Sequence, residues 1–394
     1  MTQSSVAEPQ RPRWPRRLAL GLASTLVGLL LAEGAVRLLL DPPPNVQVVE
    51  DPGASQRRAQ ENERPTELRL PVSPGGELYV KTATGLRLRA STKAVVENHR
   101  LSQRDIYLRT NSIGYRNPEI GEKRGTRVLF LGDSITFADY VQEAETWVRL
   151  VEGRFRAQGR EVETINAGVG AIGTRNELAI LQETGLALEP DVVVVGFYLN
   201  DAFDSRGFQV LQVPAALRWS RLLRLLAFVV PSMVERVDTH TEVEERKRWA
   251  EEVARRFPPG EGDPIRDRAA FNALLQKAFR DWGSAWSDPA WELLEPMLED
   301  FARLAEVHDF ELYFLCFPTR AQVQAEFECD EPQQRLAEVL GRLEVPLLDL
   351  LPPLREAWRA SEGELFYDQC HHTPRGNELV ADWVHAFLEE QLPR

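Results

Sequence analysis

The stretch RVLFLGDSITFADYV, residues 127–141, decides how the rest of the chain is interpreted. Residues 127–131 have the character of a buried strand, and they run directly into Gly132-Asp133-Ser134. One interpretation is an ordinary turn from strand to helix, with Ser134 as the helix cap. The other is a nucleophile held at the carboxyl end of a parallel strand, where open α/β sheets place their ligands. The choice depends on whether chemical partners for the serine occur elsewhere.

Strand-like and helix-like segments alternate from this stretch onward. Apolar strand-like runs lie at 127–132, 162–168, 191–198, 310–317 and 346–350. Helical patterns lie between and after them, at 146–156, 174–186, 289–307, 333–343 and 376–390. The run DVVVVGFY is apolar on both faces, as expected for a central parallel strand. The pattern therefore predicts right-handed crossovers and a three-layer α/β/α sandwich around a parallel sheet of about five strands.

The connection between the third and fourth of these strands, residues 202–308, is far longer than ordinary connections. It contains LRWSRLLRLLAFVV at 217–230, a basic amphipathic helix pattern. Such a helix could pack on the domain, roof an active site or lie on a membrane surface, and packing is the default because surface helices are amphipathic. The charged segment EVEERKRWAEEVARRF predicts a solvated helix. We expect a largely helical insertion that helps to build the substrate site.

Three further stretches contain chemistry that could act together with Ser134. The turn NAGVGAIGT (166–174) places small residues and backbone N–H groups after the second strand. Asn200, after the third strand, could donate its amide to a developing oxyanion. In DQCHHTPRGN, the D-x-x-H spacing lets Asp368 orient His371. Each feature alone is common in loops, but together they converge on one edge of the sheet and favour a nucleophile at Ser134.

This set of blocks resembles the SGNH/GDSL hydrolase superfamily. The resemblance covers residues 105–390 and rests on GDS, the NAG turn, the Asn-Asp pair, D-x-x-H with Gly376 five residues after His371, and the lead-in TNSIGYR. It implies a flavodoxin-like α/β/α hydrolase that acts on esters, thioesters or acetylated sugars. Some relatives transfer acetyl groups onto exopolysaccharides instead. By matching position, the resemblance makes Ser134 the nucleophile, His371 the base and Asp368 its orienting acid.

The resemblance also implies an oxyanion hole. Its donors would be the Ser134 N–H, a backbone N–H of the second block and the Asn200 amide. The position of the family's second-block glycine falls on Ala171, whose N–H remains a donor if φ is negative. Gly168 and Gly170 are the alternatives at this position.

A second histidine, His372, follows the expected base. The i, i+3 spacing from Asp368 and the distance to Gly376 favour His371 as the base. No metal or organic cofactor is expected, and the three cysteines lack the CxxC spacing of a zinc site. Cys329 and Cys370 could form a disulfide if the domain is exported.

The N-terminal region predicts a membrane anchor. Arginines 11, 13, 16 and 17 precede the apolar stretch 18–40, which as a helix would cover about 30 Å of hydrocarbon. A cleaved signal peptide is the alternative, but no convincing A-x-A site or lipobox cysteine follows. The basic residues before the stretch place residues 1–17 in the cytoplasm and the remainder outside, periplasmic or extracellular.

The other domain boundaries follow from composition. Residues 41–75 predict a tether rich in Pro, Glu, Arg and Gln, and 76–120 predict an extended, β-rich lead-in with a hairpin turning near Thr84-Gly85. The resemblance implies that residues 121–394 form the hydrolase domain, with 202–308 as its insertion. The net charge of −13 argues against a nucleic-acid partner.

Three functions remain open from the sequence. The first is an extracytoplasmic esterase or deacetylase that acts on an ester or an acetylated carbohydrate. The second is an O-acyltransferase that modifies an envelope polysaccharide. The third is a non-catalytic, membrane-tethered binding or scaffold protein, which the complete Ser/Asn/Asp/His set disfavours.

Overall fold

The structure is a computed structural model of the 394-residue chain. It describes residues 28, 32–35, 68–71, 78–82, 84–202, 220, 222, 243–279, 281–361 and 365–392. The chain divides into two compact units, residues 1–45 with 211–237, and residues 46–210 with 238–394. In the smaller unit, the Ser220 hydroxyl and the Leu222 N–H both donate hydrogen bonds to the Glu33 carboxylate. All elements named below belong to the larger unit.

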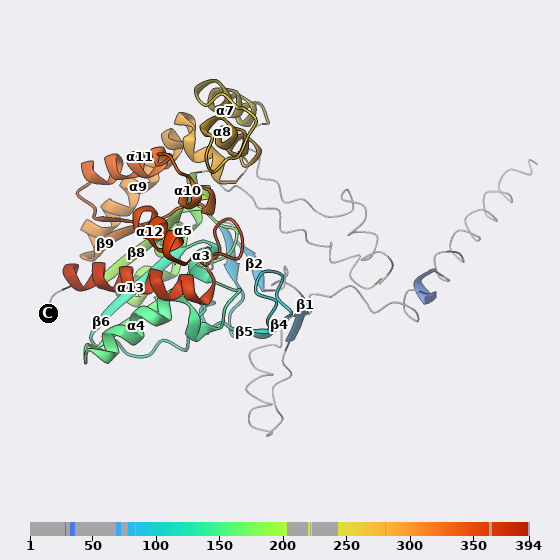
Figure 1. The fold of residues 1–394 in the computed structure, drawn as a ribbon. Helices are drawn as coiled ribbons and strands as arrows, with labels where there is room; N and C mark the ends of the chain where they lie inside the picture. Colours follow the sequence, from blue (N-terminus) through green and yellow to red (C-terminus); the bar gives the residue numbers. More distant parts are fainter. Residues whose placement is uncertain are drawn as a thin grey trace, which may run out of the picture. The chain divides into compact units, whose positions relative to one another are not determined.

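The larger unit contains a five-stranded parallel sheet with the strand order β10-β9-β8-β6-β7. Figure 1 labels three of these strands, β9, β8 and β6. Strand β8 lies in the middle and is buried along its whole length, as its apolar sequence predicts. The predicted parallel sheet is therefore confirmed, with the strands β6 Thr126–Gly132, β7 Val162–Asn166, β8 Val192–Tyr198, β9 Glu311–Phe317 and β10 Leu347–Asp349.

Helices cover both faces of this sheet. The chain moves outward from β6 to β7 and then returns past β6 to β8, so right-handed crossovers place the two connecting helices on opposite faces. On one face α4 (Trp147–Ala157) packs on α13 (Pro374–Gln391), and the two run side by side in Figure 1. On the other face α9 (Asp288–His308) packs on both α5 (Thr174–Ile180) and α11 (Glu331–Arg342). The predicted three-layer α/β/α architecture is confirmed.

Local sequence explains why α4 forms where it does. The Thr146 hydroxyl accepts a hydrogen bond from the Arg149 N–H and caps the helix. Its buried residues, Trp147, Val148, Val151 and Phe155, recur at helical spacing and face the sheet and α13. The helix predicted at 174–186 is less regular, because α5 ends at Ile180 and continues as a wide turn, η2 Leu181–Gly185, and a 3-10 turn, η3 Leu186–Leu188.

The described part of the insertion is largely helical, as predicted. It contains α7 (Val243–Arg256), α8 (Arg268–Lys277), the 3-10 turn η7 (Trp282–Trp286) and α9. Helix α7 is not simply solvated, because Val253 is buried. The amphipathic segment 217–230 lies outside the described residues except at 220 and 222. The sequence patterns did not predict α8, α10 (Arg320–Gln324) or α12 (Leu351–Ser361).

The lead-in is rich in β-structure, as expected. Strands β2 (Tyr79–Thr82) and β3 (Gly85–Leu88) form the predicted antiparallel hairpin. A second sheet contains β4 (Lys93–Glu97) between β1 (Leu68–Pro71) and β5 (Ile106–Arg109). Since β1 pairs with β4, the prediction that residues 41–75 are only a tether is wrong for β1.

No helix among the described residues is long and apolar enough to cross a membrane. Residues 18–40 are described only at 28 and 32–35, so the predicted anchor lies largely outside the described residues. The disulfide between Cys329 and Cys370 that the sequence left open is not formed in the structure, because all three cysteines are free. Cys329 Sγ lies 3.3 Å from the Arg355 guanidinium, whereas Cys370 Sγ lies 3.6 Å from His371 Nδ1.

Candidate active site

The Gly132-Asp133-Ser134 turn lies at the carboxyl end of β6. Gly132 has a φ of 153°, and a Cβ at this position would lie 2.1 Å from Thr136 Oγ1, so the close approach requires glycine. The Asp133 carboxylate accepts a hydrogen bond from the Ile135 N–H at 2.8 Å and caps the short helix α3, Ser134–Phe137. Since Asp133 supplies the cap, the interpretation of Ser134 as the capping side chain is wrong.

Three predicted site residues form a continuous hydrogen-bonded chain. His371 Nδ1 lies 2.8 Å from Asp368 Oδ2, and His371 Nε2 lies 2.9 Å from Ser134 Oγ. The backbone N–H groups of Cys370 and His371 both donate to Asp368 Oδ1 at 3.0 Å. Ser134 is half-buried, so its hydroxyl combines a fixed orientation with partial access to solvent.

The loop that contains Asp368 and His371 is fixed to α4 and α13. The Asn377 side chain donates to the His372 carbonyl and accepts from the Trp147 N–H, both at 3.0 Å. The buried ring of Tyr140 packs edge-on against the His371 ring, with 4.8 Å between ring centroids. These contacts hold the imidazole between the serine and the aspartate.

The pKa values of Asp368, His371 and the neighbouring His372 follow from these contacts and from burial. Burial raises the pKa of Asp368, but the hydrogen bond and charge of His371 outweigh burial and hold the pKa well below its usual range. Burial lowers the pKa of His371, whereas Cys370 and the hydrogen bond to Asp368 raise it, and the net pKa lies well above its ordinary value. For His372, burial and then the neighbouring His371 lower the pKa to about 3, so this ring is neutral.

The backbone N–H donors of the turn 166–174, which the resemblance assigns to the oxyanion hole, differ from the prediction. Ala171 has a φ of 62°, so the condition of a negative φ is not met, and the residue lies in the left-handed region that favours glycine. The Gly168 N–H already donates to Asn166 Oδ1 at 3.0 Å, which removes it as a free donor. The Gly170 and Ala171 N–H groups have no acceptor among the described residues, so they remain the two alternatives.

Asn200 lies at the same sheet edge as Ser134, because β8 and β6 are neighbours. Burial raises the pKa of Asp133, while the hydrogen bond from the Ile135 N–H, the charge of His371 and the nearby polar groups of Asn200 and Ser134 oppose this shift. The Ser134 N–H and the Asn200 side chain therefore both lie near the Asp133 carboxyl, beside the serine.

A group of buried carboxyls behind the serine was not predicted. Asp133, Glu177 and Asp201 are buried, and burial raises the pKa of each. Both Glu177 oxygens and Asp201 Oδ1 have no hydrogen-bond partner among the described residues. Neighbouring buried carboxyls titrate as a group, and burial and mutual repulsion disfavour the ionised form of Glu177 and Asp201. The sequence feature that could have indicated this group is an acidic residue, Glu177, within the apolar pattern of the predicted helix 174–186.

Arg116, from the lead-in TNSIGYR, was also missed as a site residue. It is buried, and its guanidinium donates to the Phe137, Ala138 and Val141 carbonyls. Burial lowers its pKa to about 10, so it stays charged at neutral pH. Arg116 thus holds the segment that follows α3 and that contains Tyr140.

Metal-ligand atoms of Asp368, Cys370 and His371 lie within 4.8 Å of one another, which makes them a possible metal cluster among the described residues. However, His371 Nδ1 is already hydrogen-bonded to Asp368. We therefore interpret these residues as part of the hydrogen-bonded chain from Asp368 through His371 to Ser134 and not as metal ligands. That the protein needs no cofactor stays a prediction.

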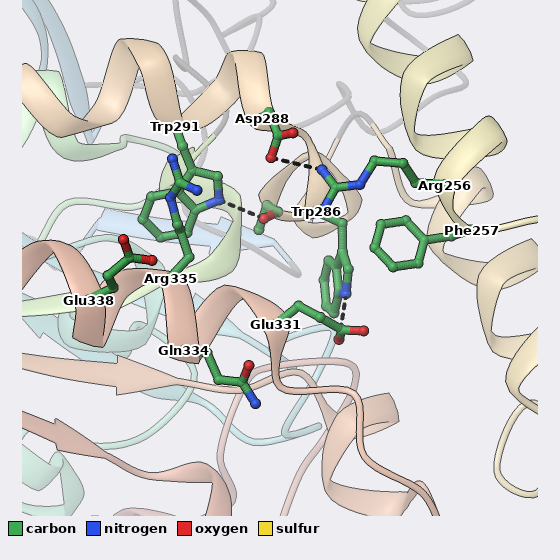
Figure 2. Close-up of a pocket in the computed structure, with 10 residues that line it drawn as sticks. Arg256, Phe257, Trp286, Asp288, Trp291, Glu331, Gln334, Arg335 and Glu338 are labelled. Carbon is green, nitrogen blue, oxygen red and sulfur yellow. Dashed lines mark hydrogen bonds and ion pairs between the residues drawn. The ribbon is translucent and has the colours of Figure 1, made fainter.

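A pocket of about 190 Å³ lies elsewhere, between the insertion and α11 (Figure 2). Two pairs of its polar groups contact each other: Trp286 Nε1 donates to Glu331 at 3.1 Å, and Arg256 pairs with Asp288 at 2.8 Å. The rings of Trp286 and Trp291 are buried and do not form an open stacking surface. We interpret this pocket as part of the packing of the insertion on the domain.

The sequence matches no protein-family model and no curated protein. Among solved structures it is similar to an acetyl xylan esterase, with 15% identity and a TM-score of 0.38 over 66% of this chain and 99% of the other. It is also similar to TesA, with 15% identity and a TM-score of 0.39 over 68% of this chain and 100% of the other. A lipase/acylhydrolase from Enterococcus faecalis has 19% identity and a TM-score of 0.36 over 68% of this chain and 97% of the other. We draw the function from the site itself.

Proposed function

We propose that this protein is a serine esterase or deacetylase of the SGNH type that cleaves carboxylic esters, in particular acetyl esters. The observation that carries the proposal is the hydrogen-bonded chain from Asp368 through His371 to Ser134, with links of 2.8 and 2.9 Å. A serine, an imidazole and a carboxylate in this order form a nucleophile, its base and the group that orients the base.

The mechanism follows from these positions. His371 takes the proton of the Ser134 hydroxyl while the oxygen attacks the acyl carbon, and Asp368 stabilises the imidazolium that forms. The tetrahedral oxyanion would accept hydrogen bonds from the Ser134 N–H, the Asn200 amide and the N–H of Gly170 or Ala171. His371 then gives its proton to the leaving alcohol. Water, activated by the same imidazole, releases the acid from the acyl-serine.

The test is hydrolysis of 4-nitrophenyl acetate by the purified chain, with Ser134→Ala as the matched variant. We expect acetate release by the wild type and a loss of about a thousandfold or more in the variant. Equal rates for the two proteins would contradict the proposal and support a non-catalytic binding role.

An added oligosaccharide acceptor separates hydrolysis from acyl transfer, because the same acyl-serine can react with water or with a sugar hydroxyl. We expect free acetate with and without the acceptor. Acetyl groups that appear mainly on the oligosaccharide, with little free acetate in its absence, would instead identify an O-acyltransferase of envelope polysaccharide.

We further propose that the chain is anchored in the cell membrane by residues 18–40, with its catalytic domain on the extracytoplasmic side. The support is the sequence asymmetry, four arginines before the apolar stretch and none directly after it. A reporter fused after Asp41 should be active only outside the cytoplasm. Cytoplasmic activity of this fusion would contradict the topology without bearing on the ester chemistry.

A further inference from the structure

The turn 168–171 contains the two backbone N–H groups that are alternatives for the oxyanion hole, and it packs against α3. The Val169 N–H donates to the Gly132 carbonyl at 3.0 Å. A Cβ at Gly168 would lie 2.4 Å from the Phe137 nitrogen, so the backbones of the turn and of α3 are in close contact. The turn is therefore fixed against the short helix that carries the candidate nucleophile.

The same turn is contacted by Tyr79, which lies in strand β2 of the lead-in hairpin. A Cβ at Gly170 would lie 2.5 Å from the Tyr79 hydroxyl oxygen and 3.5 Å from its ring carbon Cζ. The same position would lie 3.7 Å from Phe137 Cδ1. Gly170 is therefore packed against a ring of the hairpin and a ring of α3.

The hairpin that carries Tyr79 is fastened to the helical segment that follows the turn. The Leu86 N–H donates to Asn176 of α5 at 3.3 Å. The Arg87 guanidinium pairs with Glu183 of η2 at 2.7 Å. Tyr79 thus reaches the turn from a strand that is itself held in place.

The turn needs such support because of Ala171. Its φ of 62° is unfavourable for a residue with a Cβ. Backbone of this kind persists only where the surrounding contacts determine it, and it is frequent at functional sites. Relaxation of Ala171 to a negative φ would change the direction of the N–H groups in the turn.

The Tyr79 hydroxyl acts on the turn by contact. It has no hydrogen-bond partner among the residues that the structure describes. Burial, and then the charge of Asp139, hold the pKa of Tyr79 well above its usual range. The phenol therefore stays neutral and adds no negative charge beside a developing oxyanion.

We propose that Tyr79 is a positioning residue that packs on Gly170 and keeps the turn 168–171 in the conformation that presents a backbone N–H to the oxyanion. This inference rests on the proposed function. It gives the lead-in hairpin a role in the reaction through a side chain that does not contact the reacting atoms.

The test measures the kinetics of 4-nitrophenyl acetate hydrolysis for Tyr79→Leu and Tyr79→Phe, at a temperature at which circular dichroism shows both variants folded. Leucine is too short to reach Gly170, whereas phenylalanine keeps the ring in contact with it. We expect Tyr79→Leu to lower kcat roughly ten- to a hundredfold with little change in KM, because the oxyanion forms only in the transition state. Tyr79→Phe should keep most of the activity.

The pH profile separates this role from a disturbance of the base. The pH at half-maximal kcat/KM should not move in Tyr79→Leu, since His371 sets it. A shift of this pH, a loss confined to KM, or a Tyr79→Phe variant as slow as Tyr79→Leu would overturn the inference.

A double-mutant cycle with Ala171→Gly tests the coupling to the turn. Glycine adopts a positive φ readily, so the turn should depend less on Tyr79 in this background. We expect Tyr79→Leu to lower kcat only about twofold to threefold there. An equal loss in both backgrounds would contradict the proposed link.

The matched control is Tyr107→Leu, in strand β5 of the same lead-in. The Tyr107 side chain is exposed, so its replacement should leave kcat and KM unchanged. A loss equal to that of Tyr79→Leu would show a general effect of the lead-in and overturn the role of Tyr79.

A neutral fluorophosphonate probe distinguishes this failure from failure of the proposed function. Labelling of Ser134 in the wild type, together with an unchanged kcat in Tyr79→Leu, contradicts only the role of Tyr79. Absence of labelling in the wild type contradicts the serine-hydrolase proposal itself and, with it, the role of Tyr79.

Discussion

His372 is a buried imidazole whose ring nitrogens have no hydrogen-bond partner among the described residues. The rings of Phe366 and Phe317 pack against it at 4.8 and 5.8 Å between centroids. This environment suits a neutral, almost apolar ring and no proton transfer. Adjacent histidines thus have opposite environments: the first faces a carboxylate and a hydroxyl, and the second faces two phenyl rings.

We predict that His372→Phe makes the protein less sensitive to acid. The pKa of His372 is about 3 in the folded state, and it is about 6.5 in the unfolded chain. As the pH falls below 6.5, the unfolded state binds the proton first, so this group lowers the free energy of unfolding until about pH 3. The wild type should therefore lose roughly 2 to 3 kcal/mol more than the variant between pH 7.5 and pH 4.5.

Urea unfolding of both proteins at the two pH values measures this effect. The larger phenyl ring adds an offset that does not depend on pH, so the comparison uses the change with pH alone. Identical pH dependence in the two proteins would show that His372 is not a buried neutral imidazole.

At Ala171, we predict that glycine stabilises the fold. A φ of 62° is unfavourable for a residue with a Cβ, and replacement by glycine should raise the free energy of unfolding by about 1 kcal/mol. The backbone N–H is retained, so esterase activity should not fall. Thermal unfolding and 4-nitrophenyl acetate turnover test both parts, and a destabilised Ala171→Gly protein would contradict the assigned backbone conformation.

Among the elements, the lead-in before β6 has a structural role that its sequence resemblance did not explain. Arg116 satisfies three carbonyls of residues 137–141, and this segment places Tyr140 against His371. The lead-in is therefore connected to the candidate base through the segment that contains Tyr140.

We predict that Arg116→Met lowers the free energy of unfolding by about 3 kcal/mol, because three carbonyls lose their donor. Turnover should fall even where the variant is fully folded, since Tyr140 no longer holds the His371 ring in place. Arg100→Met, at an exposed position of the same lead-in, is the control and should change neither quantity. Unaltered turnover in folded Arg116→Met would contradict the link to the base.

The elements that the sequence predicted best are those with a local pattern. The run Val192–Tyr198 is apolar at every position, and the D-x-x-H spacing is a contact within one turn, so both depend on neighbours in the sequence. Strand β1 escaped prediction because its pairing with β4 is set by residues more than twenty positions away. The φ of Ala171 also escaped, because turn conformation depends on packing as well as on residue type.

On the scale of the whole molecule, the order of the strands could be derived from the sequence, but the placement of the insertion could not. Alternating strands and helices with right-handed crossovers leave few topologies, and they bring the ends of β6 and β8 together. The turn η7 lies in a connection without a recognisable motif, and only its packing against η4 (Leu199–Ala202) brings it to the carboxyl edge of the sheet. Buried partners such as Glu177 are likewise defined by the fold and not by spacing.

The central claim is that Ser134 and His371 act as one unit, and the kinetics of the histidine pair test it most directly. Turnover of 4-nitrophenyl acetate is measured for His371→Ala, His372→Ala, Ser134→Ala and the double variant Ser134→Ala/His371→Ala. We expect losses of about a thousandfold or more for the serine and His371 variants, and a double variant little worse than either, because the two groups work together. His372→Ala should keep most of its activity. Full activity of His371→Ala, or a dead His372→Ala beside a live His371→Ala, would contradict the proposed base.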